Sequence, residues 1–118
     1  MQNIKSSVFS ALLTYTALTT LVSDRIYFHH PNNFTTLPAI SYFELSNIGD
    51  LYADDIEIGS EIIMQIDIWS TTSISAIALI VDTIMVSEGF ARILSIDLFE
   101  EDTKIHHKSM RYRIDSAI

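Results

Sequence analysis

The sequence contains no cysteine, only three glycines and two prolines, and few basic residues. Without cysteine the chain can form neither a disulfide framework nor a cysteine-based metal site, and a reducing compartment suits it. The scarcity of glycine and proline excludes long flexible linkers. Seven Lys and Arg against fifteen Asp and Glu give a net charge of −8. That balance excludes a general nucleic-acid surface, because phosphate contacts need a local excess of cations.

What the sequence does contain is enough apolar material for a core. Hydrophobic residues make up 48% of its 118 residues, which excludes wholesale disorder. There is no internal repeat and no low-complexity tract. We therefore expect one folded domain that spans residues 1–118.

Residues 55–70 predict one long strand. Even-numbered positions from Ile56 to Ile68 are apolar except for Ser60, and odd-numbered positions are mostly polar. Because side chains alternate across a strand, one face should be buried and the other mostly wet. At about 3.3 Å per residue the strand spans roughly 50 Å, so it must bend or reach beyond its domain. Trp69 ends the wetter face and is expected to cap the core against the following helix, with an interface position as the alternative.

Two other stretches have helical spacing. Residues 1–23 resemble a secretory signal, but no A-x-A cleavage site follows them and they are too short for a convincing membrane span. We predict a packed amphipathic helix there, because its apolar residues recur at three- and four-residue steps. Residues 74–88 repeat this spacing, and Gly89 is a natural residue to end that helix. The N-terminal stripe consists of Val8, Leu12, Tyr15, Leu18 and Val22.

The remaining segments predict a hairpin-rich sheet. Residues 46–55, with Gly49 and three aspartates, predict the tip of a long hairpin, and residues 100–103 predict an acidic turn. Residues 115–118 are expected to fray. The order of elements predicts an α+β fold, a mainly antiparallel sheet with a long β-hairpin, packed against an N-terminal helix and a central helix. The other segments with strand-forming composition are 25–29, 39–45, 90–99 and 104–114.

Histidines are the best candidates for chemistry. His29-His30 and His106-His107 are adjacent on predicted strands, so neither pair can chelate one metal ion. A metal-dependent hydrolase would need one histidine from each pair and a carboxylate such as Asp97, whereas surface or packing histidines are the simpler explanation. No catalytic or phosphate-binding motif is present. We therefore predict no enzyme, no catalytic or metal-binding residue and no cofactor.

Contacts with partners are the remaining class of site. Apolar residues at the predicted hairpin tip indicate a partner surface, with folding back onto the strands as the alternative. Four of the seven basic residues lie within residues 104–113 of an otherwise acidic chain. Segregated charge suits head-to-tail contacts, which close into rings, although cross-strand ion pairing inside the hairpin is the simpler explanation of the basic residues. The candidate contact residues are Leu51, Tyr52, Asp54, Asp55, Lys108, Arg111 and Arg113.

Five motifs follow one another along the chain. They are V-F-S-A-L-L-T near the N-terminus, L-P-A-I-S-Y-F-E-L at 37–45, I-D-I-W-S at 66–70, M-V-S-E-G-F-A-R at 85–92 and F-E-E-D-T-K-I-H-H-K-S-M-R-Y-R at 99–113. In this order and spacing they resemble the tail-completion proteins of long-tailed phages and prophages, the tail terminator or tail-to-head joining group. Phe99 stands where that family more often has Tyr, and residues 46–54 match nothing in it.

The resemblance implies an α+β fold and a hexameric ring. The ring would sit at the head-proximal end of the tail, end tube growth and provide the surface that joins the head. The implied partners are further copies of the chain, the tail tube protein and head connector or completion proteins. DNA would pass through the ring without specific binding, which an acidic lumen would favour. The implied location is the virion tail or neck, after assembly in the host cytoplasm, with no membrane. The alternative is another neck or tail interaction module that is monomeric until it binds its partner.

Overall fold

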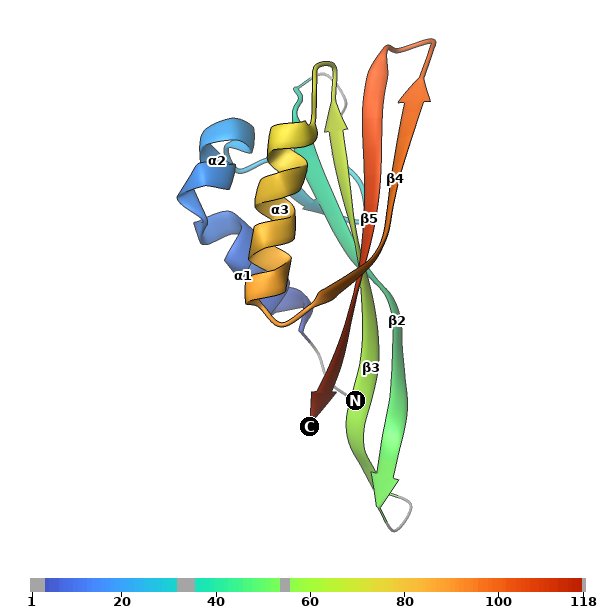
Figure 1. Cartoon of the computed structure of the whole chain (residues 1–118). Coiled ribbons are helices and arrows are strands. Elements are labelled where there is room, and N and C mark those ends of the chain that lie inside the picture. Colours follow the sequence, from blue (N-terminus) through green and yellow to red (C-terminus); the bar gives the residue numbers. More distant parts are fainter. Residues whose placement is uncertain (1–3, 32–35, 54–55, 118) are drawn as a thin grey trace.

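The computed structural model describes residues 4–31, 36–53 and 56–117, which form three helices and five strands (Figure 1). The helices are α1 (Lys5–Thr14), α2 (Thr16–Val22) and α3 (Ser75–Ser87). The strands are β1 (Ile26–Phe28), β2 (Ala39–Ala53), β3 (Ile56–Ser70), β4 (Ala91–Glu100) and β5 (Ile105–Ala117). The molecule is elongated, with principal extents of 53, 29 and 22 Å.

The strands form one sheet in the order β1-β2-β3-β5-β4. Every neighbouring pair is antiparallel except β1 with β2. The helices lie together on one side of the sheet (Figure 1). We call the other side the open face; along β3 it carries Glu61, Ile63, Gln65, Asp67 and Trp69. The predicted α+β fold, a mainly antiparallel sheet with a long hairpin, is confirmed.

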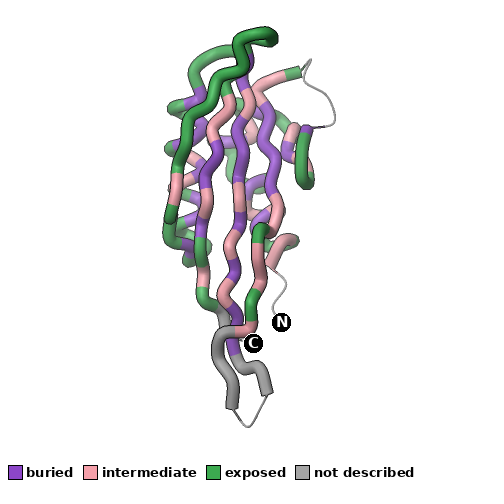
Figure 2. The backbone as a smooth tube through the Cα atoms, turned by 90° about the vertical axis from the view of Figure 1, so that its right-hand side faces the viewer, coloured by how far each residue is buried: buried purple, intermediate pink, exposed green. Residues whose placement is uncertain are grey.

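The core lies between the sheet and the helices. The even-numbered side chains of β3 that the structure describes face the helices and are buried, as the alternation predicted; those of Ile56 and Ile58 lie outside the described side chains. Each buried aliphatic side chain of this size stabilises the fold by about 1.5–3 kcal/mol. Figure 2 shows buried positions concentrated in the central strands and exposed positions along β4. The core side chains contributed by β3 and α3 include Ile62, Met64, Ile66, Ile68, Ile77, Val81, Ile84 and Met85.

The N-terminal helix is broken, contrary to the prediction. Tyr15 has an extended backbone (φ −81°, ψ 107°) between α1 and α2, and its side chain is exposed. Leu12 and Leu18 are six residues apart, so an unbroken helix would point them about 120° apart, at the two margins of the predicted apolar stripe. The break lets both side chains be fully buried. Among the helices described, none is long and apolar enough to cross a membrane.

The β2–β3 hairpin is longer than predicted. Residues 46–53, predicted as its tip, continue β2 with register shifts near Leu45 and Leu51. Because the backbone groups of the long β3 need partners, pairing overrides the turn-like composition of this segment. For the same reason residues 115–117, predicted to fray, continue β5 as far as Ala117, opposite Gly59.

Candidate functional site

The predicted contact residues occupy two separate regions. Leu51 and Tyr52 belong to the part of β2 near the end of the hairpin, which extends well past the helices in Figure 1. Their side chains, and residues Asp54 and Asp55, lie outside the described part of the chain. The three basic candidates lie on β5 instead, so the structure does not bring the two groups together within one subunit.

Two of the basic candidates form ion pairs with neighbouring side chains. Lys108 Nζ lies 2.7 Å from Oδ1 of Asp97, its cross-strand neighbour on β4. Arg113 Nη2 lies 3.3 Å from Oε2 of Glu61 and 3.1 Å from Oδ2 of Asp115. The subunit itself therefore neutralises these cations, as the cross-strand alternative expects.

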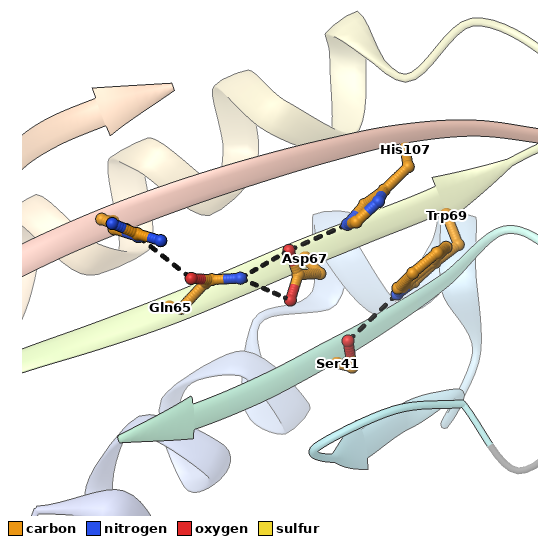
Figure 3. A network of polar contacts seen from close by, with 6 residues as sticks. Ser41, Gln65, Asp67, Trp69 and His107 are labelled. Carbon is orange, nitrogen blue, oxygen red and sulfur yellow. Dashed lines mark hydrogen bonds and ion pairs between the residues drawn. The ribbon is translucent and has the colours of Figure 1, made fainter. Parts of the chain in front are cut away.

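The third basic candidate, Arg111, contacts a polar network on the open face; Figure 3 shows Gln65, Asp67 and His107 of this network. Arg111 Nε donates to Gln65 Oε1 at 3.0 Å. Gln65 Nε2 donates to both carboxylate oxygens of Asp67 at 3.1 Å. Asp67 Oδ1 lies 2.9 Å from His107 Nε2. Asp67 is only 4% exposed, because the neighbouring side chains of this network shield it from solvent.

Trp69 and His107 stack at one end of this network. Their ring centroids are 3.7 Å apart at an interplanar angle of 13°. Trp69 Nε1 donates to Ser41 Oγ at 3.0 Å. The expected core-capping position of Trp69 is wrong, since its neighbour Ile68 faces the helices and alternation turns the indole to the open face. A large aromatic ring with a satisfied N–H, on an uncovered face, is typical of protein interfaces.

The sequence alone indicates which residues of β3 belong to this network, but not which residues of β5 join them. The odd-numbered positions of residues 55–70 already placed Gln65, Asp67 and Trp69 on one face. The missing part was the register of β5, which sets His107 opposite Trp69 and Arg111 opposite Gln65. That register joins residues about 40 positions apart, and neither strand specifies it locally.

Tyr112, the aromatic residue between Arg111 and Arg113, faces the helices instead. Its ring is fully buried, and its hydroxyl donates to Asp82 Oδ1 of α3 at 2.8 Å. Burial, and then the hydrogen bond to the Asp82 carboxylate, raises the pKa of Tyr112 well above its usual value. Tyr112 therefore ties α3 to the sheet in its neutral form.

The histidines do not assemble a metal site in the part of the chain that the structure describes. There, no group of three His, Asp or Glu side chains is placed to hold a metal ion. His29 directly follows β1, and β2 and β3 separate that strand from β5. Asp97 is paired with Lys108, and His107 with Asp67. The arrangement that a metal-dependent hydrolase would need is not formed by these residues.

Comparison with known proteins gives one family and one fold. The model of the family described as "Tail completion protein gp17" matches residues 6–114. No curated protein matches the chain. Among solved structures, a chain from the "Virion of native gene transfer agent (GTA) particle" is similar, with a TM-score of 0.74 and 15% sequence identity over 94% of this chain and 92% of that chain. At this identity the structural similarity shows the fold alone.

Proposed function

The chain belongs to the tail completion protein gp17 family and is a structural protein of the phage tail; we propose that it forms a ring at the head-proximal end of the tail, ends growth of the tail tube and provides the surface that joins the head. The family resemblance predicted from the five motifs is confirmed. The observation that carries the proposal is the extent of the family match, residues 6–114, which takes in every helix and strand of the fold at least in part.

The shape and the surface of the molecule support this proposal. The β2–β3 hairpin extends past the helices (Figure 1), which gives a subunit a projection that can reach a neighbour or the tube. The open face presents an aromatic and polar cluster around Trp69, a composition common in protein interfaces. The net charge of −8 suits a ring through which DNA passes without being held.

The proposal is tested by adding the purified chain to tail tubes. The expected results are a cap at one end of each tube in electron micrographs and an arrest of tube growth. Native mass spectrometry over a range of concentrations should show a hexamer, either of the free chain or of the chain released from capped tubes. Tubes that stay uncapped and keep growing in excess chain contradict the proposal.

A variant of the hairpin end localises the tube contact. The double substitution Leu51→Ser, Tyr52→Ser should impair capping without lowering thermal stability, if these residues meet the tube. Leu79→Ser is the matched control, because Leu79 is an exposed apolar residue of α3 far from the hairpin end. An equal loss of thermal stability and capping in the double variant would instead place Leu51 and Tyr52 in the packed interior.

The ion pairs on β5 favour a second candidate function. Because Lys108 and Arg113 are paired within the subunit, they offer little free charge for contacts between copies. The second candidate is therefore another neck or tail interaction module, monomeric until it binds a head or neck partner. A chain that stays monomeric on tubes and binds isolated heads would support this candidate over the terminating ring.

A further inference from the structure

In the part of the chain that the structure describes, the sheet has an unpaired stretch of strand edge on each side. β4 forms one of them. On the other side, β1 pairs with β2 only at residues 40–42. Among the described residues, no strand pairs with the outer edge of β2 beyond Tyr42. An unpaired edge presents a row of N–H and C=O groups that can template another strand.

The β4 edge lacks the usual protection against pairing. Its register is regular from Leu94 to Glu100. Within it, Ile96 is 42% and Leu98 is 51% exposed. Asp97 is the one charged residue between Leu94 and Phe99, and its carboxylate is paired with Lys108 on β5. Natural edge strands usually carry a free lysine, a proline or a bulge at such positions.

The β2 edge is also apolar, and its register with β3 is regular from Ser46 to Gly49, beyond the shift near Leu45. Ile48 is 55% exposed, and Leu45 is exposed beside it. Glu44 is the one charged residue in the segment 43–49, and it accepts a hydrogen bond from Asn47. Two apolar edges on opposite sides of one sheet are complementary surfaces, so the occupant that both fit is a second copy of this chain.

The two edges are staggered along the strands. Ile96 is level with Ser109, then Asp67, then Ser41 across the sheet. Ile48 is level with Glu61, six residues from Asp67 along β3, because β2 has a register shift near Leu45. A second copy that brings its Ile48 to Ile96 is therefore displaced along the strands by about 20 Å, at about 3.3 Å per residue.

A displacement of this size matches what closure into a barrel requires. Five strands about 4.8 Å apart make a sheet about 24 Å wide. A shift of about 20 Å over that width corresponds to strands tilted by about 40°, within the range of about 35–45° found in closed barrels. Each copy added with this stagger thus continues the sheet towards closure.

We propose that residues 95–98 of β4 pair with residues 46–49 of β2 in the next copy, so that the sheets of successive copies join into one closed barrel. β4 and β2 run in opposite directions, so copies with a common orientation pair antiparallel at this contact. Ile96 and Ile48 face each other there, because both lie on the open face, level with Asp67 and Glu61 respectively. This contact rests on the proposed ring and names how its subunits join.

The absence of cysteine allows a direct test by crosslinking. The double variant Ile48→Cys, Ile96→Cys can form disulfides only between copies, and oxidation should give a ladder of covalent multimers on denaturing gels. A second pair from the same strand pairing, Ser46→Cys with Leu98→Cys, should also give covalent multimers. Each single variant should stay monomeric on the gel. The matched control pair is Leu79→Cys with Ile96→Cys, since Leu79 is exposed on α3, and it should give no ladder.

The outcomes separate this contact from the proposed function. Crosslinking is carried out on the free chain and on chain bound to tail tubes. If tubes are capped but neither pair crosslinks, the contact is wrong and the terminating ring stands. If tubes are not capped and neither pair crosslinks, both the contact between copies and the terminating ring are contradicted. Dimers formed by Ile96→Cys alone, in the yield of the double variant, indicate a β4-to-β4 contact and overturn the proposal.

Charged edge variants provide an independent test. Ile96→Lys and Ile48→Lys each block one edge, so each should be monomeric by native mass spectrometry under conditions where the wild-type chain assembles. Mixed in equal amounts, the two variants should form heterodimers, because the intact β4 edge of Ile48→Lys can pair with the intact β2 edge of Ile96→Lys. The heterodimers should grow no further, since both of their remaining edges are blocked. Leu79→Lys is the control and should assemble normally. Rings formed by either single variant would overturn the proposal.

Discussion

At the scale of single residues, the open face keeps a carboxylate buried without a covering layer. Burying a carboxylate costs several kcal/mol unless hydrogen bonds compensate for lost hydration. Gln65 donates to both oxygens of Asp67, and His107 lies within hydrogen-bond distance of Oδ1. The same network fixes the stacked rings of Trp69 and His107. Because these side chains are already ordered, a partner that binds them loses little rotamer entropy.

Replacing Asp67 tests this account. Asp67→Ala leaves Gln65 and His107 without their acceptor, and the free energy of unfolding should fall by about 1–3 kcal/mol. The matched control is Asp97→Ala, because the Asp97 side chain is 75% exposed and such surface ion pairs contribute at most about 1 kcal/mol. Urea denaturation followed by Trp69 fluorescence measures both. Equal changes in the two variants would contradict a buried role for Asp67.

The buried tyrosine makes stability depend on alkaline pH. The raised pKa of Tyr112 means that the folded chain keeps its phenol proton at a pH where the unfolded chain, with a pKa of about 10, loses it. The contribution of Tyr112 to the free energy of unfolding should therefore fall as the pH rises above about 10, by up to about 1.4 kcal/mol per pH unit. Below about pH 9 this contribution should not change with pH.

The variant Tyr112→Phe isolates this contribution. At pH 7 it should be less stable by about 1–2 kcal/mol, because the hydrogen bond to Asp82 is lost. Between pH 9 and pH 11 it should lose less stability than the wild-type chain, since phenylalanine has no proton to release. Urea denaturation at pH 7, 9, 10 and 11 gives both quantities. Parallel pH profiles for the two proteins would contradict the assignment.

At the scale of elements, α3 is held in place by how it ends. Gly89 has φ +94°, a conformation that side chains with a Cβ adopt only with strain. This turn lets Phe90 N donate to Met85 O at 3.0 Å and leads directly into β4. An added Cβ at position 89 would also lie 3.3 Å from Ile114 Cδ1 of β5. Gly89 therefore forms the turn that connects α3 to the edge strand β4.

Gly89→Ala should lower the free energy of unfolding by about 1–2 kcal/mol, the usual penalty for this backbone region. Glu88→Ala is the control, because Glu88 has an ordinary φ of −85° and an exposed side chain. Thermal and urea denaturation of the two variants measure the difference. A Gly89→Ala variant as stable as the control would show that the turn relaxes without strain.

What the sequence predicts at this scale depends on whether a signal is local. The apolar alternation of β3 and the helical spacing of α3 are local, and both elements were predicted nearly to their ends. The continuation of β2 past Leu45 was missed because its cause is pairing with β3. The network around Asp67 was missed because the register between β3 and β5 is non-local. The break at Tyr15 follows from which sides Leu12 and Leu18 must face, which only the packed core decides.

At the scale of the whole molecule, charge and edge pairing oppose each other. Each copy brings a net charge of −8, and copies in a ring repel one another through solvent. The proposed contact between β4 and β2 consists of backbone hydrogen bonds and apolar side chains, and neither is weakened by salt.

Raising NaCl from about 50 mM to about 500 mM shortens the screening length well below 10 Å. Self-association of the wild-type chain should therefore strengthen, seen as a larger oligomeric fraction by light scattering at fixed chain concentration. The Leu79→Lys control should respond in the same direction. Association that weakens with salt would mean that attractive ion pairs between copies dominate, and would return Lys108, Arg111 and Arg113 to the contact in place of the apolar edges.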